Sequence, residues 1–273
     1  MLVDVKQMAL NIKNECKEHL AKLSYSPYLM IVQVEGDAAS DSYTKGKRAD
    51  CAEVGLKCVH KLLPGNSSFG DVYDTITDGN LDEHCIGIIL QLPLPKHLVP
   101  YQGALIDHID ILKDVDGFRA ESPFKPCTPA GIMEIIKHWT GTNDLSDTTV
   151  LVIGRGKLVG APLYDMLNKE NATIIQANSH TTRDTLRELC RVADIIVTAT
   201  GHRNTLDETM LQPGYAGLIV DAGITRGDDG KLYGDCDKAL YYAARAEITP
   251  VPGGVGLMTR AMLIKNCVDS TEV

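Results

Sequence analysis

The 273-residue sequence lacks a long apolar run and lacks an excess of positive charge. Its longest apolar runs, such as IGIIL and ADIIV, have the length of a strand, whereas a membrane-spanning helix needs about 20 apolar residues. Lys and Arg number 27 against 36 Asp and Glu, and the net charge of -9 gives no electrostatic footprint for nucleic acid. We therefore expect neither a membrane nor a nucleic acid as a partner.

Paired cysteine motifs are also missing. The eight cysteines form no C-x-x-C pair and no cysteine/histidine cluster at zinc spacing, so we expect free thiols and no metal. The amino-terminal segment carries charges throughout and has neither the apolar core nor the cleavage site of a secretory signal. We therefore expect a cytoplasmic protein.

What is present is typical of a folded protein of two domains. Hydrophobic residues make up 44% and charged residues 23%, and the length allows two domains of ordinary size. Short apolar segments alternate with helical patterns, which predicts parallel sheets with crossover helices. Strands are expected at 28–34, 57–63, 86–93, 150–154, 172–177, 193–200 and 217–224, with helices over 2–23, 40–55, 72–76, 130–139 and 161–170.

The two α/β series meet at a segment rich in turn residues. Between Asp116 and Pro129, glycine, serine and three prolines interrupt any periodicity. The fold class we expect is therefore α/β with two domains. The second series has the strand and helix alternation of a Rossmann-type dinucleotide-binding domain.

A glycine-rich turn opens the second series. The strand VLVI runs into Gly154, Arg155 and Gly156, and a helical pattern begins at Gly160. Gly154 permits the tight turn, Gly156 lets a pyrophosphate approach the backbone, and the amino terminus of the helix supplies N–H donors. The spacing here is G-x-G-x-x-x-G rather than G-x-G-x-x-G. The prediction of a dinucleotide site therefore depends more on the position of the turn between a strand and a helix than on the motif itself.

The end of the next strand indicates which dinucleotide is bound. An NAD-selective site usually has an acidic residue there, but this sequence has Ser179 and no carboxylate between Asn178 and Arg183. Arg155 and Ser179 together suit a 2′-phosphate, which favours NADP. NAD remains the alternative.

A Tyr/Lys pair marks the first series. Tyr43 and Lys47 are four residues apart on an expected helix that follows a strand, so they share one helix face. Short-chain dehydrogenases carry such a pair after the glycine loop, whereas here it comes more than a hundred residues before that loop. On its own the pair is also compatible with a solvated helix surface.

Several longer segments resemble the bifunctional methylenetetrahydrofolate dehydrogenase/cyclohydrolase family. They cover nearly the whole chain in the family's order: SYTKGKRADCAEVG, GIILQLPLP, KDVDGF, PCTPAGIMEII, VIGRGKLVGAPL, ADIIVTATG, VDAGI, GDCD and ITPVPGGVGLMT. The resemblance implies a catalytic domain over 1–122 with 255–273, an NAD(P)-binding domain over 123–254, a cleft between them and a homodimer.

The resemblance also implies roles for individual residues. Lys47 would be the catalytic lysine, Gln91 its hydrogen-bonding partner and Asp116 the carboxylate that anchors the pterin, with Tyr43 stacking on the folate ring. A carboxylate suits the paired N–H donors of an aminopyrimidine. The folate would also contact Pro252, Gly253 and Gly254, and the cofactor would contact Gly154, Arg155, Gly156, Gly160, Ser179, Thr200, Gly201 and Ile224.

The activity that the resemblance implies belongs to one-carbon metabolism, including the supply of purine biosynthesis. Hydride would pass from 5,10-methylenetetrahydrofolate to NADP, and water would open the methenyl product to 10-formyltetrahydrofolate. The segment from Phe118 to Pro126 is shorter than the family's, and Gly156 stands where the family usually has serine. Two alternatives therefore stay open, a monofunctional NAD(P)-dependent dehydrogenase and a non-catalytic module that binds NADP or folate.

Overall fold

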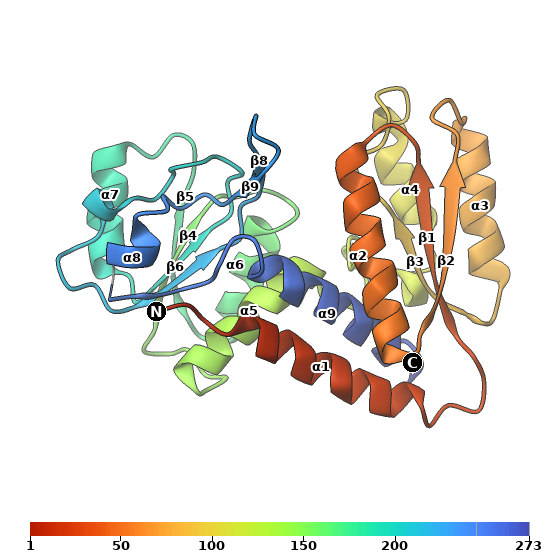
Figure 1. Ribbon diagram of the computed structural model, residues 1–273, viewed down its shortest axis with the longest axis horizontal. Helices are drawn as coiled ribbons and strands as arrows, with labels where there is room; N and C mark the ends of the chain where they lie inside the picture. The colour runs from red at the N-terminus through yellow and green to blue at the C-terminus, as the bar shows by residue number, and fades with distance from the viewer. Residues whose placement is uncertain (244, 273) are drawn as a thin grey trace. The chain divides into compact units, whose positions relative to one another are not determined.

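The computed structural model describes residues 1–243 and 245–272, which form two compact units (Figure 1). The three-stranded unit comprises Leu10–Cys127 and Arg260–Val273, and the five-stranded unit comprises Met1–Ala9 and Thr128–Thr259. Each unit contains a parallel sheet with crossover helices, which confirms the expected α/β class. In the described ranges no helix is both long enough and apolar enough to cross a bilayer.

The sheet of the three-stranded unit has the order β2-β1-β3, and all its strands are parallel. Its central strand β1 (Tyr28–Val34) is almost completely buried because it lies between β2 (Lys57–Leu63) and β3 (Cys85–Leu90). Alternate residues of β1 therefore face opposite sides of the sheet. The bounds of β1 and β2 agree with those expected from the sequence, whereas β3 begins one residue earlier than expected and ends at Leu90 rather than at Pro93.

One face of this sheet is apolar. Met30, Val32 and Val34 of β1 pack with Val72 and Ile76 of α3 (Phe69–Leu81) in one buried cluster. Ser68 caps the amino terminus of α3 in a capping box with Asp71, and α4 (Gln102–His108) packs beside α3. In Figure 1, α3 lies along the side of the sheet away from α2.

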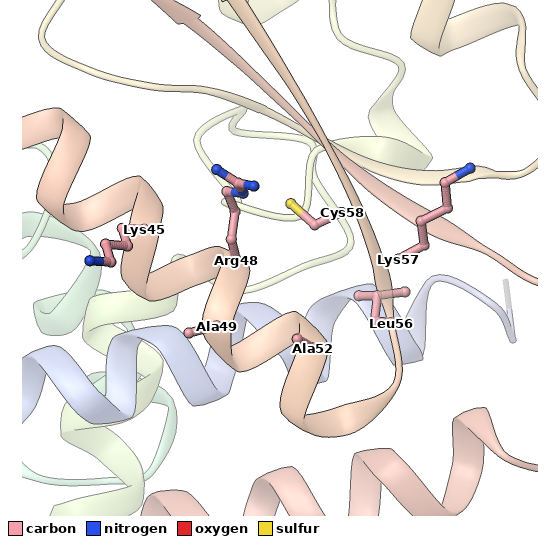
Figure 2. Close-up of a pocket in the computed structure, with 7 residues that line it drawn as sticks. All are labelled: Lys45, Arg48, Ala49, Ala52, Leu56, Lys57 and Cys58. Carbon is pink, nitrogen blue, oxygen red and sulfur yellow. The ribbon is translucent and has the colours of Figure 1, made fainter.

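The opposite face carries α2 (Ala38–Val54). Gln33 of β1 points to this side, where its amide accepts a hydrogen bond from Thr44 of α2 at 3.0 Å. Asp37 caps the start of the helix, and Gly55 ends it at a φ of +82°. Gly55 reverses the chain, so that β2 starts beside the last turns of α2, as Figure 2 shows.

The five-stranded unit has a parallel sheet of order β10-β7-β6-β4-β5. The strand β4 (Thr149–Ile153) lies between β5 (Thr173–Ala177) and β6 (Ile195–Thr198), so the chain moves to one side of β4 and then crosses to the other. This is the switch point at which doubly wound folds bind ligands. The remaining strands of the sheet are β7 (Leu218–Asp221) and β10 (Glu247–Ile248).

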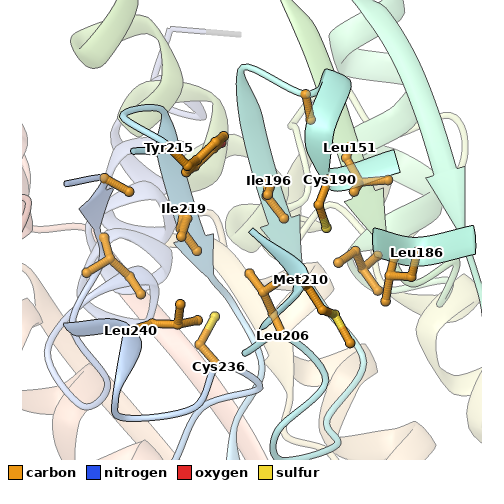
Figure 3. Packing of buried hydrophobic residues seen from close by; sticks show 14 of the residues in the cluster. Leu151, Leu186, Cys190, Ile196, Leu206, Met210, Tyr215, Ile219, Cys236 and Leu240 are labelled. Atoms are coloured by element: carbon orange, nitrogen blue, oxygen red, sulfur yellow. The ribbon is translucent and has the colours of Figure 1, made fainter. Parts of the chain in front are cut away.

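Large apolar side chains fill the core of this unit. Leu151, Ile196 and Ile219 come from three neighbouring strands and are buried in one cluster, which Figure 3 shows. Ile248 of β10 also pairs with Leu2 through an isolated parallel bridge. The amino-terminal residues 1–9 therefore belong to this unit and not to the three-stranded one.

The expected major helices and strands are present, whereas several short elements were not expected. Besides β10, these are the hairpin of β8 (Thr225–Arg226) and β9 (Leu232–Tyr233), α4 and the short helix α8 (Leu240–Ala243). The other helices are α1 (Val5–Leu20), α5 (Cys127–Thr140), α6 (Gly160–Lys169), α7 (Arg183–Val192) and α9 (Val255–Asp269).

Candidate active site

Helix α2 is held at its start against the loop that follows β3. Asp37 accepts hydrogen bonds from the backbone N–H and the hydroxyl of Ser40, and the same hydroxyl also donates to the carbonyl of Leu92 at 3.3 Å. This connection fixes the first turn of α2 relative to the residues directly after β3. Tyr43 and Lys47 lie one and two turns further along the helix.

Lys47 and Gln91 contact each other as the sequence predicts. The Lys47 ammonium donates to Oε1 of Gln91 at 3.2 Å, and the two side chains are only 6% and 7% exposed. Gln91 is fixed by two further bonds, from its backbone N–H to Val32 and from its side-chain amide to Leu92 at 2.7 Å. Because the NH2 group of Gln91 donates to the Leu92 carbonyl, the Oε1 atom of Gln91 faces Lys47.

Tyr43 presents its ring to the same lysine. The Lys47 Nζ atom lies 5.2 Å from the ring centroid, within the range of a cation–π contact. Burial raises the pKa of the Tyr43 phenol, and the nearby charge of Asp116 raises it further. The ring therefore stays neutral at physiological pH.

Asp116 lies in a turn that a second carboxylate braces. Asp114 is buried and accepts hydrogen bonds from the backbone N–H groups of Phe118 and Arg119, at 3.3 and 2.9 Å. Gly117 has a φ of +67°, and a Cβ there would lie 2.7 Å from the backbone of Lys125. Asp116 itself is half-buried, and among the residues that the structure describes its carboxylate has no hydrogen-bond or ion-pair partner.

Cys127 lies close to these groups, and its thiol is buried. Its buried thiol donates to the carbonyl of Val115 at 3.3 Å, and burial raises the pKa of the thiol well above its ordinary value. The Asn266 amide also donates to that carbonyl, at 2.8 Å. Cys127, the first residue of α5, is thus a packed thiol.

Sequence reasoning missed a charged cluster on the neighbouring part of α2. Asp50, one turn after Lys47, forms ion pairs with Lys13 at 3.3 Å and with Arg260 at 2.7 Å. The Arg260 guanidinium lies against Gly46, where a Cβ would be 2.2 Å from Nη1. The three charged residues are widely separated in the chain, and no spacing pattern links them.

In the glycine loop of the five-stranded unit, glycine is sterically required at two of the three glycine positions. Gly154 has a φ of +125°, and a Cβ there would lie 2.3 Å from the carbonyl oxygen of Ala199. A Cβ on Gly160 would lie 2.2 Å from the carbonyl oxygen of Gly154. Gly156, in contrast, has nothing within 4 Å of this position, so a side chain there would meet no clash.

The other predicted cofactor residues lie on loops after neighbouring parallel strands. Arg155 follows β4 and Ser179 follows β5, and both are exposed. Thr200 and Gly201 follow β6, and Ile224 follows β7. The fold thus brings these residues to the carboxyl edge of one sheet.

Two buried aspartates shape this edge. Asp235 accepts hydrogen bonds from the backbone N–H and the hydroxyl of Thr200, at 2.6 and 2.9 Å. Asp221 accepts from the N–H groups of Asp235 and Cys236 and from the hydroxyl of Thr198. Burial raises the pKa of the Asp221 carboxyl. The two aspartates thus brace the backbone at this edge, and Asp235 positions the Thr200 loop.

The loop with Pro252, Gly253 and Gly254 belongs to the five-stranded unit. Gly253 has a φ of +100°, and a Cβ on Gly254 would lie 2.3 Å from the Pro250 carbonyl oxygen. The part that these residues play in binding folate stays a prediction. So do the roles of the other predicted site residues and the domain boundaries at 122/123 and 254/255, since the compact units divide the chain after residues 9, 127 and 259.

Comparison with known proteins places both halves of the chain in one family. Residues 3–116 match the model for the catalytic domain of tetrahydrofolate dehydrogenase/cyclohydrolase, and residues 126–273 match the model for its NAD(P)-binding domain. The bifunctional protein FolD of Agathobacter rectalis is 37% identical over 283 aligned positions, which cover 99% of each chain.

Solved structures agree with this comparison. The crystal structure of the bifunctional enzyme FolD from Campylobacter jejuni is 35% identical, with a TM-score of 0.89 and coverage of 100% of this chain and 98% of that one. The Trypanosoma brucei enzyme, solved with NADP and an inhibitor, is 27% identical, with a TM-score of 0.88 and coverage of 100% and 97%. The chain belongs to the tetrahydrofolate dehydrogenase/cyclohydrolase family.

Proposed function

We propose that this protein oxidises 5,10-methylenetetrahydrofolate to the methenyl compound with NADP and then hydrolyses that compound to 10-formyltetrahydrofolate. The observation that carries the proposal is the buried contact between Lys47 and Gln91, with Tyr43 and Asp116 beside it. A degraded site would not be expected to keep a buried ammonium on a fixed amide, because burying a charge is costly unless it is well paired.

Lys47 is the proposed proton carrier of the hydrolysis. Opening the methenyl cation requires a proton to leave the attacking water and another to reach the departing nitrogen. Gln91 accepts a hydrogen bond from the lysine but carries no charge, so it orients Nζ without holding it in an ion pair. The lysine is thereby free to exchange a proton with the water or the substrate.

Asp116 and Tyr43 are the proposed folate-binding residues. The Asp116 carboxylate has no partner in the described part of the chain, so both of its oxygens can accept from the N–H donors of the pterin. The neutral Tyr43 ring offers a flat apolar surface to the folate ring system. We further propose that Pro252, Gly253 and Gly254 contact the folate.

The glycine loop suits a dinucleotide. The open backbone at Gly156, the start of α6 at Gly160 and the exposed Arg155 together provide N–H donors and a cation for phosphates. NADP, when bound, supplies the acceptor for the hydride. Ser179 and Arg155 are the proposed contacts of the 2′-phosphate, while Thr200, Gly201 and Ile224 contact the rest of the cofactor.

Other features of the proposal rest on the resemblance and on charge. We propose a homodimer in the cytoplasm, a catalytic domain over 1–122 with 255–273 and an NAD(P)-binding domain over 123–254. The net charge of -9 supports the absence of a nucleic-acid partner. We likewise propose that the protein has no membrane partner.

The proposal is tested with purified protein in two absorbance assays. The first follows the formation of the methenyl product from methylenetetrahydrofolate with NADP or with NAD, and the second follows the decay of added methenyltetrahydrofolate. Native protein should reduce NADP and accelerate the decay. Lys47→Met should lower the rate of hydrolysis by roughly 10²- to 10⁴-fold, because general acid–base catalysis is lost, while NADP binding and the unfolding temperature persist.

Lys61→Met is the matched control, because Lys61 is an exposed lysine on β2 of the same unit. It should hydrolyse methenyltetrahydrofolate at the native rate. Hydrolysis by Lys47→Met at a near-native rate would remove this residue from the mechanism. Oxidation without accelerated decay in the native protein would indicate a monofunctional dehydrogenase, and nucleotide binding without either activity would indicate a binding module.

A further inference from the structure

Two cysteines lie side by side where α2 meets β2. Cys51 is in the last turn of α2, and its carbonyl accepts a hydrogen bond from the N–H of Leu56 at 2.9 Å, which closes the helix onto the following strand. The strand β2 therefore runs back beside α2, and Cys58 is its second residue. The side chains of Cys51 and Cys58 share a hydrogen bond, which places the two thiols next to each other.

Only one of the two sulfurs is accessible. Cys51 is fully buried, whereas Cys58 is half-buried and is the one cysteine among the eight described that is not fully buried. Cys58 lines a cavity of about 520 Å³ between α2 and β2. In Figure 2 its side chain points toward the side chain of Arg48. The complete lining is Lys45, Arg48, Ala49, Ala52, Leu56, Lys57 and Cys58.

The electrostatics of the pair distinguish an attacking thiol from a second, resolving thiol. The hydrogen bond from Cys51, together with the charges of Arg48 and Lys47, lowers the pKa of Cys58. The same hydrogen bond and burial raise the pKa of Cys51. Because the thiolate is the nucleophile in thiol–disulfide exchange, Cys58 reacts first and Cys51 second.

We propose that Cys51 and Cys58 form a modification site that reacts with a small anionic disulfide of the oxidised glutathione class. The Cys58 thiolate attacks one sulfur of that disulfide, forms a mixed disulfide and releases one glutathione thiolate. Cys51 then attacks the Cys58 sulfur, its proton passes to the second departing glutathione, and a Cys51–Cys58 disulfide results. The two cysteines are oxidised, and one small disulfide is reduced to two thiols.

The charge of the cavity selects the reagent. Lys45, Arg48 and Lys57 bring three cations to its lining, and the lining contains no acidic residue. An oxidant that carries carboxylates is therefore attracted to the approach to Cys58, whereas a cationic disulfide is repelled. Substrate and NADP take no part in this reaction, so the inference does not depend on the proposed function.

The test uses the full-length native protein, incubated with oxidised glutathione and analysed by intact mass and peptide mapping. Native protein should lose two hydrogen atoms in mass, and the Cys51 and Cys58 peptides should be joined. Cys51→Ala should instead gain one glutathionyl group on Cys58, because the resolving thiol is absent. Cys58→Ser should remain unmodified under the same conditions, and dithiothreitol should reverse both products.

Cys16→Ala is the matched control, because Cys16 is a buried thiol of the same unit whose pKa burial raises to about 11. It should be oxidised like the native protein. The proposal is overturned if native protein stays unmodified or if Cys58→Ser reacts as fast as native protein. A native protein that stops at the mixed disulfide would overturn the role of Cys51, and peptide mapping gives this result without any variant.

The cavity's charge is tested separately with Arg48→Gln. We expect the ratio of the rates for oxidised glutathione and for a neutral disulfide such as hydroxyethyl disulfide to fall severalfold in this variant. Because both reagents attack the same sulfur, a change in thiolate content affects both rates and cancels in the ratio. An unchanged ratio would overturn the selection of an anionic reagent.

Discussion

In the three-stranded unit the predicted catalytic groups are side chains held by packing. Lys47 and Gln91 are both buried, and they hydrogen-bond to each other. In the five-stranded unit the predicted cofactor contacts are mostly backbone groups and exposed side chains, namely the open Gly156 and the exposed Arg155 and Ser179. The first set is fixed by its neighbours, whereas the second is fixed by the path of the main chain.

This difference follows from what each region has to do. Moving a proton requires a few atoms at defined distances, and packing supplies that precision. Binding a dinucleotide requires N–H groups and a cation along an extended anion, and a tight turn before a helix supplies these. Substitutions should therefore act through side-chain chemistry in one unit and through backbone conformation in the other.

The largest combined effect on activity and stability is expected for Gly154→Ala. The added Cβ would lie 2.3 Å from the Ala199 carbonyl oxygen at a φ of +125°, so the turn must move. A displacement of this kind should lower NADP-dependent oxidation by roughly 100-fold or more and should also lower the unfolding temperature. Steady-state kinetics and thermal unfolding measure both effects.

Gly156→Ala is the matched variant for this prediction, because a Cβ at Gly156 has nothing within 4 Å. It should unfold at the native temperature, although its NADP affinity can change. Equal destabilisation by the two substitutions would mean that the steric account of the loop is wrong. The comparison isolates the turn conformation from the loss of a glycine as such.

A second prediction concerns Gln91→Glu, which keeps the shape of the side chain and adds a charge. The carboxylate would form a buried ion pair with the Lys47 ammonium, 3.2 Å from it in the native arrangement, and hold it protonated. Hydrolysis of methenyltetrahydrofolate should fall on the order of 10²-fold. Oxidation should fall less, since hydride transfer depends chiefly on orientation.

Gln91→Met provides the control for charge. It removes the hydrogen bond without an ion pair, so its hydrolysis rate should lie between those of the native protein and Gln91→Glu. A Glu variant as active as native protein would show that a neutral partner is unimportant to the lysine. The two Gln91 variants thus test whether side-chain chemistry controls the activity of the three-stranded unit.

Much of the fold was predictable because its strands are short apolar runs bounded by polar or turn residues. The expected bounds of β1 and β2 agree with the structure for this reason. The strand β10 was missed because it has only two residues, and it exists through pairing with β7. Local sequence carries little information about an element that the rest of the sheet creates.

The candidate site was predictable to a similar degree. Tyr43 and Lys47 share a helix face by their spacing, and the contact with Gln91 was implied by the resemblance. The ion pairs of Asp50 with Lys13 and Arg260 were not predicted, because they join helices that are distant in the chain. Such contacts depend on tertiary packing, which no periodicity in the sequence encodes.

Arg155→Ala is expected to have a smaller effect that depends on the cofactor. A charge-assisted contact with the 2′-phosphate is worth about 1.5 kcal/mol at the lower end, which corresponds to about a tenfold rise in the KM for NADP. The KM for NAD should change little because NAD lacks this phosphate. An equal change for both cofactors would remove Arg155 from the recognition of NADP.

Arg183→Ala is the control for Arg155→Ala. Arg183 is an exposed arginine of the same unit that forms an ion pair with Asp207. Its replacement should leave the ratio of the two KM values unchanged. Measuring the ratio rather than either constant cancels any general loss of activity.

The smallest effect is expected from helix caps, and it tests whether the two units unfold together. Ser68 caps α3 in the three-stranded unit, and Thr182 caps α7 in the five-stranded unit, where its side chain accepts from the N–H of Thr185. Replacing either residue by alanine should cost about 1 kcal/mol. Neither residue belongs to a proposed site, so both activities should persist at 25 °C.

Calorimetry distinguishes the two possible outcomes. If the units unfold as one, each substitution lowers a single transition by a similar amount, about 2–4 °C for a chain of this size. If they unfold separately, Ser68→Ala lowers one transition and Thr182→Ala the other. Because each unit has its own sheet and buried core, we expect two transitions, each of which responds to the cap within its own unit.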